Sequence, residues 1–187
     1  MRFSTKALAT TALAIIAVAL ATTPAAAQNS NVGTVNINAN LPEAITVNLT
    51  NNTNVTISLA SNTATNTQTS PAIGVTTAWV LNPGRTAVKV FIDSTQANPL
   101  TNTTDTIPAT SIKISNALAG PYTALTAGGA PFGVAGAQIG GSTTITGTNR
   151  SGSRTDNVFI AIDTTFNAQL SAGTYSGSLN VQAQATP

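Results

Sequence analysis

The sequence contains neither histidine nor cysteine, and these two absences exclude most familiar kinds of active site. Histidine is the usual general base near neutral pH and the commonest metal ligand, while cysteine supplies thiolate nucleophiles and disulfides. A Ser-His-Asp triad cannot be assembled, and a zinc site would lack its usual ligands. No spacing of the acidic residues suggests the paired carboxylates of a glycosidase. We therefore predict a protein that is not an enzyme, with no catalytic residues, no cofactor and no metal.

Charged residues are also scarce, at 6% of the chain against about 25% in ordinary soluble domains. The seven basic and five acidic residues give a formal net charge of +2. Two of the basic residues, Arg2 and Lys6, lie within the first 27 residues, which we predict to be a signal peptide. The rest of the chain has five basic and five acidic residues and is therefore neutral. A nucleic-acid partner requires a basic stripe that releases phosphate counterions, and we predict none. A neutral surface offers little repulsion against self-association.

The first residues have the order of a secretory signal peptide. Arg2 and Lys6 precede an apolar run over 7–21, which is followed by small residues up to Ala27. We predict a cleaved signal peptide over 1–27, with an uncleaved anchor helix as the alternative. The apolar run is too short for a permanent membrane span of about 20 residues. The protein is therefore expected to be secreted or at the cell surface, with the periplasm as a second location.

The remaining chain alternates apolar and polar residues with period two, whereas helix signals are nearly missing. The alternating runs lie at 33–39, 45–49, 55–59, 88–92, 158–162 and 175–183. Short strands separated by Gly, Pro and Asn turns are typical of sandwiches and barrels. We predict an all-β domain over 28–187, a single immunoglobulin-like Greek-key β-sandwich of about seven to nine strands.

Local composition predicts where the chain turns and where it connects strands. The runs 45–49 and 55–59, joined by an Asn-rich turn, predict a β-hairpin. Asn82-Pro83-Gly84 predicts a turn, because Pro and Gly punctuate regular structure. A Gly-, Ala- and Pro-rich stretch over 117–141 predicts a long connection. Trp79 is expected in the core rather than on a sugar-stacking surface.

Two of the basic residues gather beside an acid at Arg150, Arg154 and Asp156. We predict that they lie in a loop over 147–157. One interpretation is a loop that recognises a ligand or a partner subunit, with both arginines donating hydrogen bonds. The other is a solvated loop in which Arg154 and Asp156 form a local ion pair, which contributes at most about 1 kcal/mol when exposed.

The run Ser171–Val181 reads A-G-T-Y-S-G-S-L-N-V after its first serine. It resembles the closing strand of bacterial secreted fimbrial subunits and spore-coat-protein-U-like proteins, which often carry an A-G-x-Y-x-G-x-L-x-V pattern. In such families an alternating N-terminal extension can complete the sheet of a neighbouring subunit.

That resemblance implies a candidate strand-exchange segment made up of Gly33, Val35, Ile37 and Ala39. The alternative is that these residues form an ordinary first strand in the protein's own sheet.

These observations lead to a prediction of function. We expect an exported, non-catalytic structural or assembly protein of the bacterial cell surface, similar to a pilus, coat or matrix subunit. Its partners are further copies or other surface-assembly components. The alternative is a secreted carbohydrate- or protein-binding β-sandwich module, using Trp79, Tyr122 or the arginine-containing loop.

Overall fold

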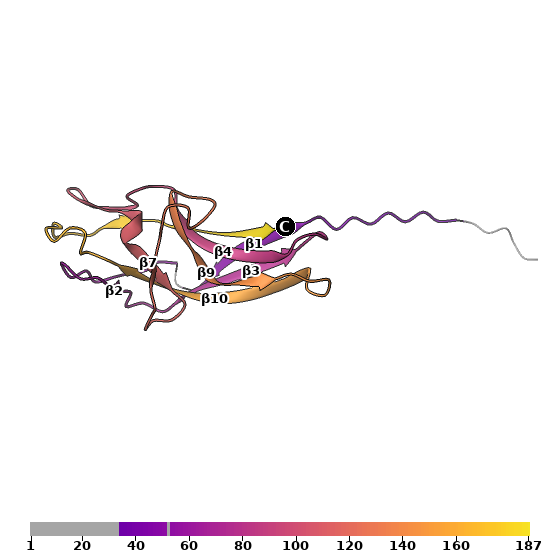
Figure 1. Ribbon diagram of the computed structural model, residues 1–187, viewed down its shortest axis with the longest axis horizontal. Helices are drawn as coiled ribbons and strands as arrows, with labels where there is room; N and C mark the ends of the chain where they lie inside the picture. Colours follow the sequence, from indigo (N-terminus) through magenta and orange to yellow (C-terminus); the bar gives the residue numbers. More distant parts are fainter. Residues whose placement is uncertain (1–33, 52) are drawn as a thin grey trace, which may run out of the picture. The chain divides into compact units, whose positions relative to one another are not determined.

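The computed structural model describes residues 34–51 and 53–187 (Figure 1). A compact unit formed by Leu41–Pro187 contains every described strand. Residues 34–40 belong to a separate unit and form no strand. The predicted signal peptide and Gly33 lie outside the described residues.

The compact unit is all-β, and its one described helix is the short 3-10 turn η1 (Ala109–Ser111). The described strands, in chain order, are β1 (Ala44–Thr50), β2 (Asn66–Thr67), β3 (Ile73–Val80), β4 (Ala87–Ser94), β5 (Leu100–Thr101), β6 (Thr106–Ile107), β7 (Ile112–Ser115), β8 (Thr123–Ala124), β9 (Ala135–Thr144), β10 (Ser151–Ile162), β11 (Ser176–Gly177) and β12 (Asn180–Thr186). Seven of these strands have four or more residues, and the other five have two. No described helix is long and apolar enough to cross a membrane.

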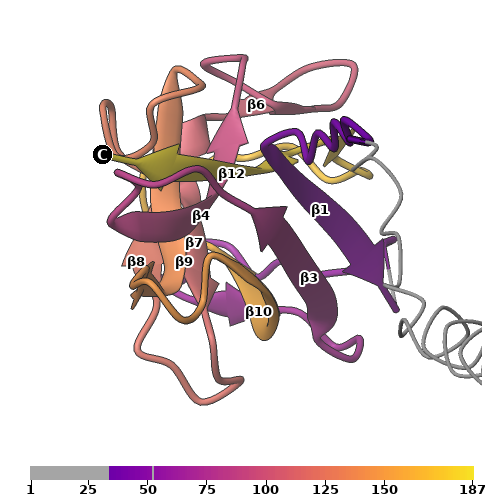
Figure 2. The same cartoon turned by 90° about the vertical axis from the view of Figure 1, so that its right-hand side faces the viewer.

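The strands form three antiparallel sheets. The first sheet has the order β1-β3-β10-β7-β8, with β2 also paired to β10; the second has the order β12-β4-β9; the third, β11-β5-β6, is small. Figure 2 shows β1, β3 and β10 on one side of the unit and β12, β4 and β9 on the other. The arrangement is sandwich-like, because apolar residues of the first two sheets meet between them.

The core consists of two clusters of buried apolar side chains. The main cluster is supplied by β3, β4, β7, β9, β10 and the segments beside them: Ile73, Val75, Val90, Ile92, Ala109, Ile112, Ile114, Leu125, Ala135, Ala137, Ile139 and Val158. A second cluster contains Trp79, Leu81, Val88 and Ile145. Alternate residues of each strand supply these side chains, as the period of two requires.

The predicted hairpin between 45–49 and 55–59 is wrong. β1 pairs instead with β3, in a register that runs from Ala44 opposite Val80 to Thr50 opposite Gly74. The run 55–59 contains only an isolated bridge at Ile57. A strand of eight residues offers β1 a full ladder of hydrogen bonds, which the shorter run cannot match.

The predicted connection over 117–141 is wrong in its second part. β9 begins at Ala135 and sends Ala135, Ala137 and Ile139 into the core. Alanine and glycine carry little β-propensity, so the strand has no signal of its own in the sequence. It forms because β4 supplies an apolar partner along most of its length.

Other local predictions are confirmed. Gly84 has a φ of +99° in the predicted turn before β4, a value that favours glycine. In β4, Val88 and Val90 are completely buried. Trp79 is only 5% exposed and belongs to the core. These positions follow from strong local signals, namely a Pro-Gly turn and alternating branched side chains.

Candidate functional site

β1 forms an open edge of the first sheet. It pairs with β3 on one side, and no described strand pairs with its other side. Its sequence, AITVNLT, contains no charged residue, proline or glycine, and its register with β3 has no bulge. Natural proteins usually protect edge strands with Lys, Pro or bulges. β1 has none of these, so its unpaired edge lacks the usual protection; β12 of the second sheet lies close to β1.

The side chains of β1 present one apolar and one polar row. Ile45 and Val47 are half-buried and pack against the two core clusters, while Leu49 remains 40% exposed. Thr46 and Asn48 point the other way and are exposed. A strand added at this edge would therefore extend an existing apolar row.

The candidate strand-exchange segment lies in the unit that precedes this edge strand in the chain. Val35 and Ile37 are 82% and 85% exposed, and Ala39 is exposed as well. Residues 34–43 belong to no strand, so the alternative of an ordinary first strand in the protein's own sheet is not observed. Gly33, the first member of the predicted segment, lies outside the described residues.

The outward face of β1, β3 and β10 carries only small or uncharged side chains. The strands align so that Ala44, Val80 and Ser151 form one row, Thr46, Ala78 and Ser153 the next, and Asn48, Thr76 and Thr155 a third. The hydroxyl oxygens of Thr76 and Thr155 lie 3.0 Å apart, within hydrogen-bonding distance. This neutral face lies directly beside the open edge.

The segment that contains Arg154 and Asp156 is a strand, and the predicted loop over 147–157 is therefore wrong from Ser151 onward. β10 pairs with β3 from Ser151 to Val158. Small polar side chains such as those of Ser151 and Ser153 give no apolar alternation, but they are accommodated on the outward face of the sheet. Arg154 and Asp156 are two residues apart, and so they share the opposite face.

Arg154 and Asp156 form the predicted ion pair, with 2.8 Å between Nε and Oδ2. The Arg154 guanidinium also donates to the carbonyl oxygen of Ile139 at 2.9 Å, to Thr143 Oγ1 at 3.0 Å and to the carbonyl oxygen of Gly141. Four of its five N–H groups are therefore occupied. Arg154 joins β10 to β9 and is not free to bind a ligand.

The structure places Arg150 apart from this pair. Its side chain is exposed in the loop before β10, and its backbone carbonyl accepts a hydrogen bond from the Leu81 N–H at 2.8 Å. Within the described part of the chain, no acidic side chain forms an ion pair with it.

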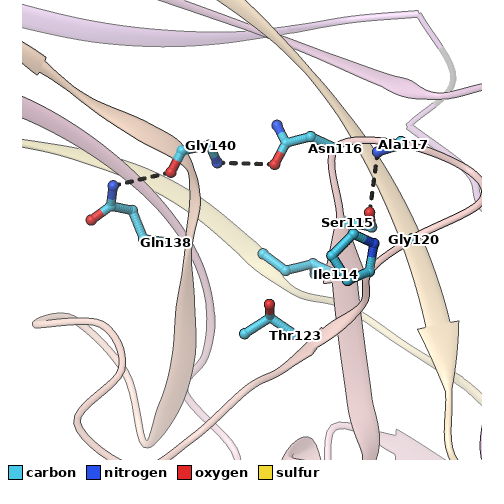
Figure 3. A pocket seen from close by; sticks show the side chains of 9 residues that line it. Ile114, Ser115, Asn116, Ala117, Gly120, Thr123, Gln138 and Gly140 are labelled. Atoms are coloured by element: carbon cyan, nitrogen blue, oxygen red, sulfur yellow. Dashed lines mark hydrogen bonds between the residues drawn. The ribbon is translucent and has the colours of Figure 1, made fainter.

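An open hollow of about 340 Å³ lies between the end of β7 and the middle of β9 (Figure 3). The described residues that line it carry no charge; they are Ile114, Ser115, Asn116, Ala117, Gly120, Pro121, Thr123, Gln138 and Gly140. Asn116 Oδ1 accepts the Gly140 N–H at 3.1 Å, and Gln138 Nε2 donates to the Gly140 carbonyl oxygen at 3.1 Å. Both backbone polar groups of Gly140 in β9 are thus held by amide side chains.

Gly140 connects the wall of this hollow to the Arg154–Asp156 pair. Its φ is +59°, a left-handed conformation that favours glycine. A Cβ at this position would lie 2.9 Å from Asp156 Oδ1 and 3.6 Å from Arg154 Nη2. The ion pair therefore lies directly behind the bend of β9 and fixes its position.

The two aromatic candidates are both committed to structural contacts. Trp79 Nε1 donates to the carbonyl oxygen of Asn149 at 3.0 Å, and its ring packs in the second core cluster. The Tyr122 hydroxyl donates to the carbonyl oxygen of Leu118 at 2.9 Å, and burial raises the pKa of this hydroxyl. Neither ring forms an open stacking platform.

Two further ion pairs hold loops of the unit. Arg85 lies 2.8 Å from Glu43, and its hydrogen bond lowers the pKa of the Glu43 carboxyl. Lys113 lies 2.8 Å from Asp163, and its hydrogen bond, with help from Thr165, lowers the pKa of Asp163 to about 2. Among the described residues, no cluster of three acidic side chains could hold a metal ion.

Comparison with protein-family models, curated proteins and solved structures gave no match. The assignment of the open edge and the hollow as candidate sites therefore depends only on the geometry of this chain. Sequence reasoning identified neither the hollow nor its amide residues. Asn116 and Gln138 are far apart in the chain and come together only because β7 and β9 are in contact, so no spacing in the sequence could have indicated them.

Proposed function

We propose that this protein is an exported, non-catalytic structural or assembly subunit of the bacterial cell surface, of the pilus, coat or matrix kind. The observation that carries this proposal is the unprotected edge of β1, which has neither charge nor proline nor bulge. The proposal includes the finer fold, an immunoglobulin-like Greek-key β-sandwich. It also includes removal of residues 1–27 as a signal peptide, which delivers the protein to the cell surface or the medium.

Subunits associate, in this proposal, by addition of a strand to β1. The segment 34–39 of one copy pairs with the free edge of β1 in the next copy. Both sequences alternate apolar and polar residues and neither carries a charge. Val35 and Ile37, which are exposed in the single chain, extend the apolar row of Ile45 and Val47 when the added strand is in place.

A single contact of this kind is weak. Burial of Val35 and Ile37 and the added backbone hydrogen bonds favour pairing, but association and the ordering of the segment oppose it with free energies of similar or larger size. Assembly therefore depends on subunit concentration and on repetition along a chain of subunits.

The net charge and the surface beside β1 both favour assembly rather than a monomeric protein. The chain after the predicted leader is neutral, so subunits meet without net repulsion. The outward face beside β1 is uncharged and has small side chains, so close approach of a neighbour costs little desolvation of charge. The resemblance of Ser171–Val181 to the closing strand of fimbrial and spore-coat-protein-U-like subunits agrees with this role.

The experiment is to measure assembly of the exported protein by size-exclusion chromatography and negative-stain microscopy across a concentration series. Val35→Asp with Ile37→Asp places charge on the apolar row of the segment and should leave only monomers. Asn36→Asp with Asn38→Asp adds the same charge to its polar row and should preserve assembly. An unaltered protein that stays monomeric at every concentration, or assembles equally with both pairs of substitutions, would disprove the proposal.

A further inference from the structure

We infer that the hollow between β7 and β9 is a binding site for a sugar residue of an uncharged glycan. The site does not depend on the assembly proposed above. It combines three properties: hydrogen-bonding groups of both kinds, a small apolar surface and a rigid wall. Its volume, about 340 Å³, lies within the range of about 300–1,000 Å³ that is usual for small-molecule sites.

The hydrogen-bonding groups of the lining suit hydroxyl groups. Asn116 Nδ2 donates one hydrogen to the carbonyl oxygen of Asn157 and retains a second, because an amide nitrogen carries two. Gln138 donates to Gly140, which leaves its carbonyl oxygen as an acceptor. Thr123, also in the lining, adds a hydroxyl that both donates and accepts. A sugar hydroxyl does the same and can use each of these groups.

The remaining lining supplies an apolar surface and excludes charge. Ala117 and Pro121, which are both exposed, offer carbon atoms to the C–H face of a sugar ring. In the part of the chain that the structure describes, no arginine, lysine or carboxylate belongs to the lining, so an anionic ligand would lose hydration without gaining a counter-charge. The chemistry therefore favours a neutral glycan over a phosphate or an acidic sugar.

The wall of the hollow is held in place before a ligand arrives. Asn116 and Gln138 are bound to the two polar groups of Gly140 (Figure 3), and Gly140 is backed by Arg154 and Asp156. Preformed groups lose little conformational freedom on binding. Arg154 and Asp156 are thus positioning residues for this site, although neither is available to the ligand.

The affinity of one site should be low. The hollow is open, and its described lining residues include no aromatic ring, so a single sugar residue is expected to bind with a dissociation constant on the order of millimolar. Repetition of the site along an assembly raises the effective affinity by avidity. This last step rests on the proposed function, whereas binding to the monomer does not.

The test is a nuclear magnetic resonance titration of the protein that carries Val35→Asp and Ile37→Asp, so that assembly does not interfere. The probes are glucose, galactose, mannose and N-acetylglucosamine, with glucuronate as the charged comparison. We expect saturable shifts of the amide signals of Thr123 and Gly140 with at least one neutral sugar, and none with glucuronate. Thr123→Val and Gln138→Leu should each weaken binding about tenfold, the effect of losing roughly 1.4 kcal/mol of hydrogen bonding.

Thr46→Val serves as the matched control, because it makes the same replacement on β1, away from the hollow. It should leave the titration unchanged. The inference is overturned if no neutral sugar produces saturable shifts at these amides. It is equally overturned if glucuronate binds as well as the neutral sugars, or if Thr123→Val and Gln138→Leu have no more effect than Thr46→Val. Failure here leaves the assembly experiment unaffected, since that experiment measures particle size without a sugar.

Discussion

Replacement of Arg154 by methionine should destabilise the protein far more than the same replacement at Arg150. Arg154 donates four hydrogen bonds, one to Asp156 and three to acceptors on β9. Methionine retains most of the apolar packing of the stem but removes all four bonds and leaves Asp156 without its cation. Arg150 is exposed, so it provides a control with the same change of charge.

The magnitude follows from the burial of the pair. Removal of one partner from a buried ion pair costs about 3–5 kcal/mol, and one hydrogen bond to a charged group contributes about 1.5–3 kcal/mol. The side chains of Arg154 and Asp156 are 16% and 15% exposed, and water that reaches Asp156 reduces the loss. We expect the free energy of unfolding to fall by about 2–4 kcal/mol for Arg154→Met and by less than about 0.5 kcal/mol for Arg150→Met.

Urea unfolding followed by the fluorescence of Trp79, the only tryptophan, measures both variants. The midpoint should move to lower urea for Arg154→Met with no change in slope, because the exposed area on unfolding is unaltered. Asp156→Leu added to Arg154→Met should cost less than the two single losses together, since the orphaned carboxylate is then absent. Equal midpoints for Arg154→Met and Arg150→Met would refute the assignment of Arg154 as a structural link between β10 and β9.

Three other predictions concern stability and use the same urea assay. The lowered pKa of Asp163, about 2 against an ordinary 3.8, means that its pairing stabilises the fold fully above about pH 4. This stabilisation disappears as the pH falls towards 2. It amounts to at most about 1 kcal/mol because the pair is partly exposed. Lys113→Met should reduce this pH dependence without abolishing it, because the hydrogen bonds from Thr165 to Asp163 remain; an unchanged pH profile would contradict the role of Lys113. Gly140→Ala should cost about 1–2 kcal/mol, since φ is +59° there. Gly141→Ala, where a Cβ meets nothing within 4 Å, should cost much less, and equal losses would argue against strain at the bend. Leu179→Ala should cost about 2 kcal/mol, the lower end of the range for buried leucine, because Leu179 is only half-buried against the main cluster; a negligible loss would make the segment before β12 peripheral.

The sequence predicts those elements whose signals are local. Val88, Val90 and Ile92 alternate in branched residues and form β4 where expected. Trp79 is large and apolar and lies in the core as predicted. The Arg154–Asp156 ion pair was also predicted, from two opposite charges close together in the sequence, although the loop predicted around it is the strand β10.

Features that depend on distant segments were not predictable in the same way. The partner of β1 is β3 rather than the run at 55–59, which is nearer in the sequence. Local composition does not indicate which of two distant segments a strand will pair with. β9 was not predicted because its glycine and alanine residues have low β-propensity. The links from Arg154 to β9, and the hollow lined by Asn116 and Gln138, exist only once these strands are side by side.

The most direct test of the proposed assembly is disulfide cross-linking between two copies, which is clean because the chain has no native cysteine. Protein with Asn38→Cys, on the polar row that shares a face with Thr46 and Asn48 when the strand is added, is mixed under oxidising conditions with protein that carries Thr46→Cys or Asn48→Cys on β1. A disulfide requires Cα atoms within about 7 Å, so strand addition predicts heterodimers with one or both β1 positions. Thr123→Cys on β8, at the opposite edge of the same sheet, should give none. Cross-links at Thr123→Cys as readily as on β1, or no cross-links at β1, would contradict assembly through this edge.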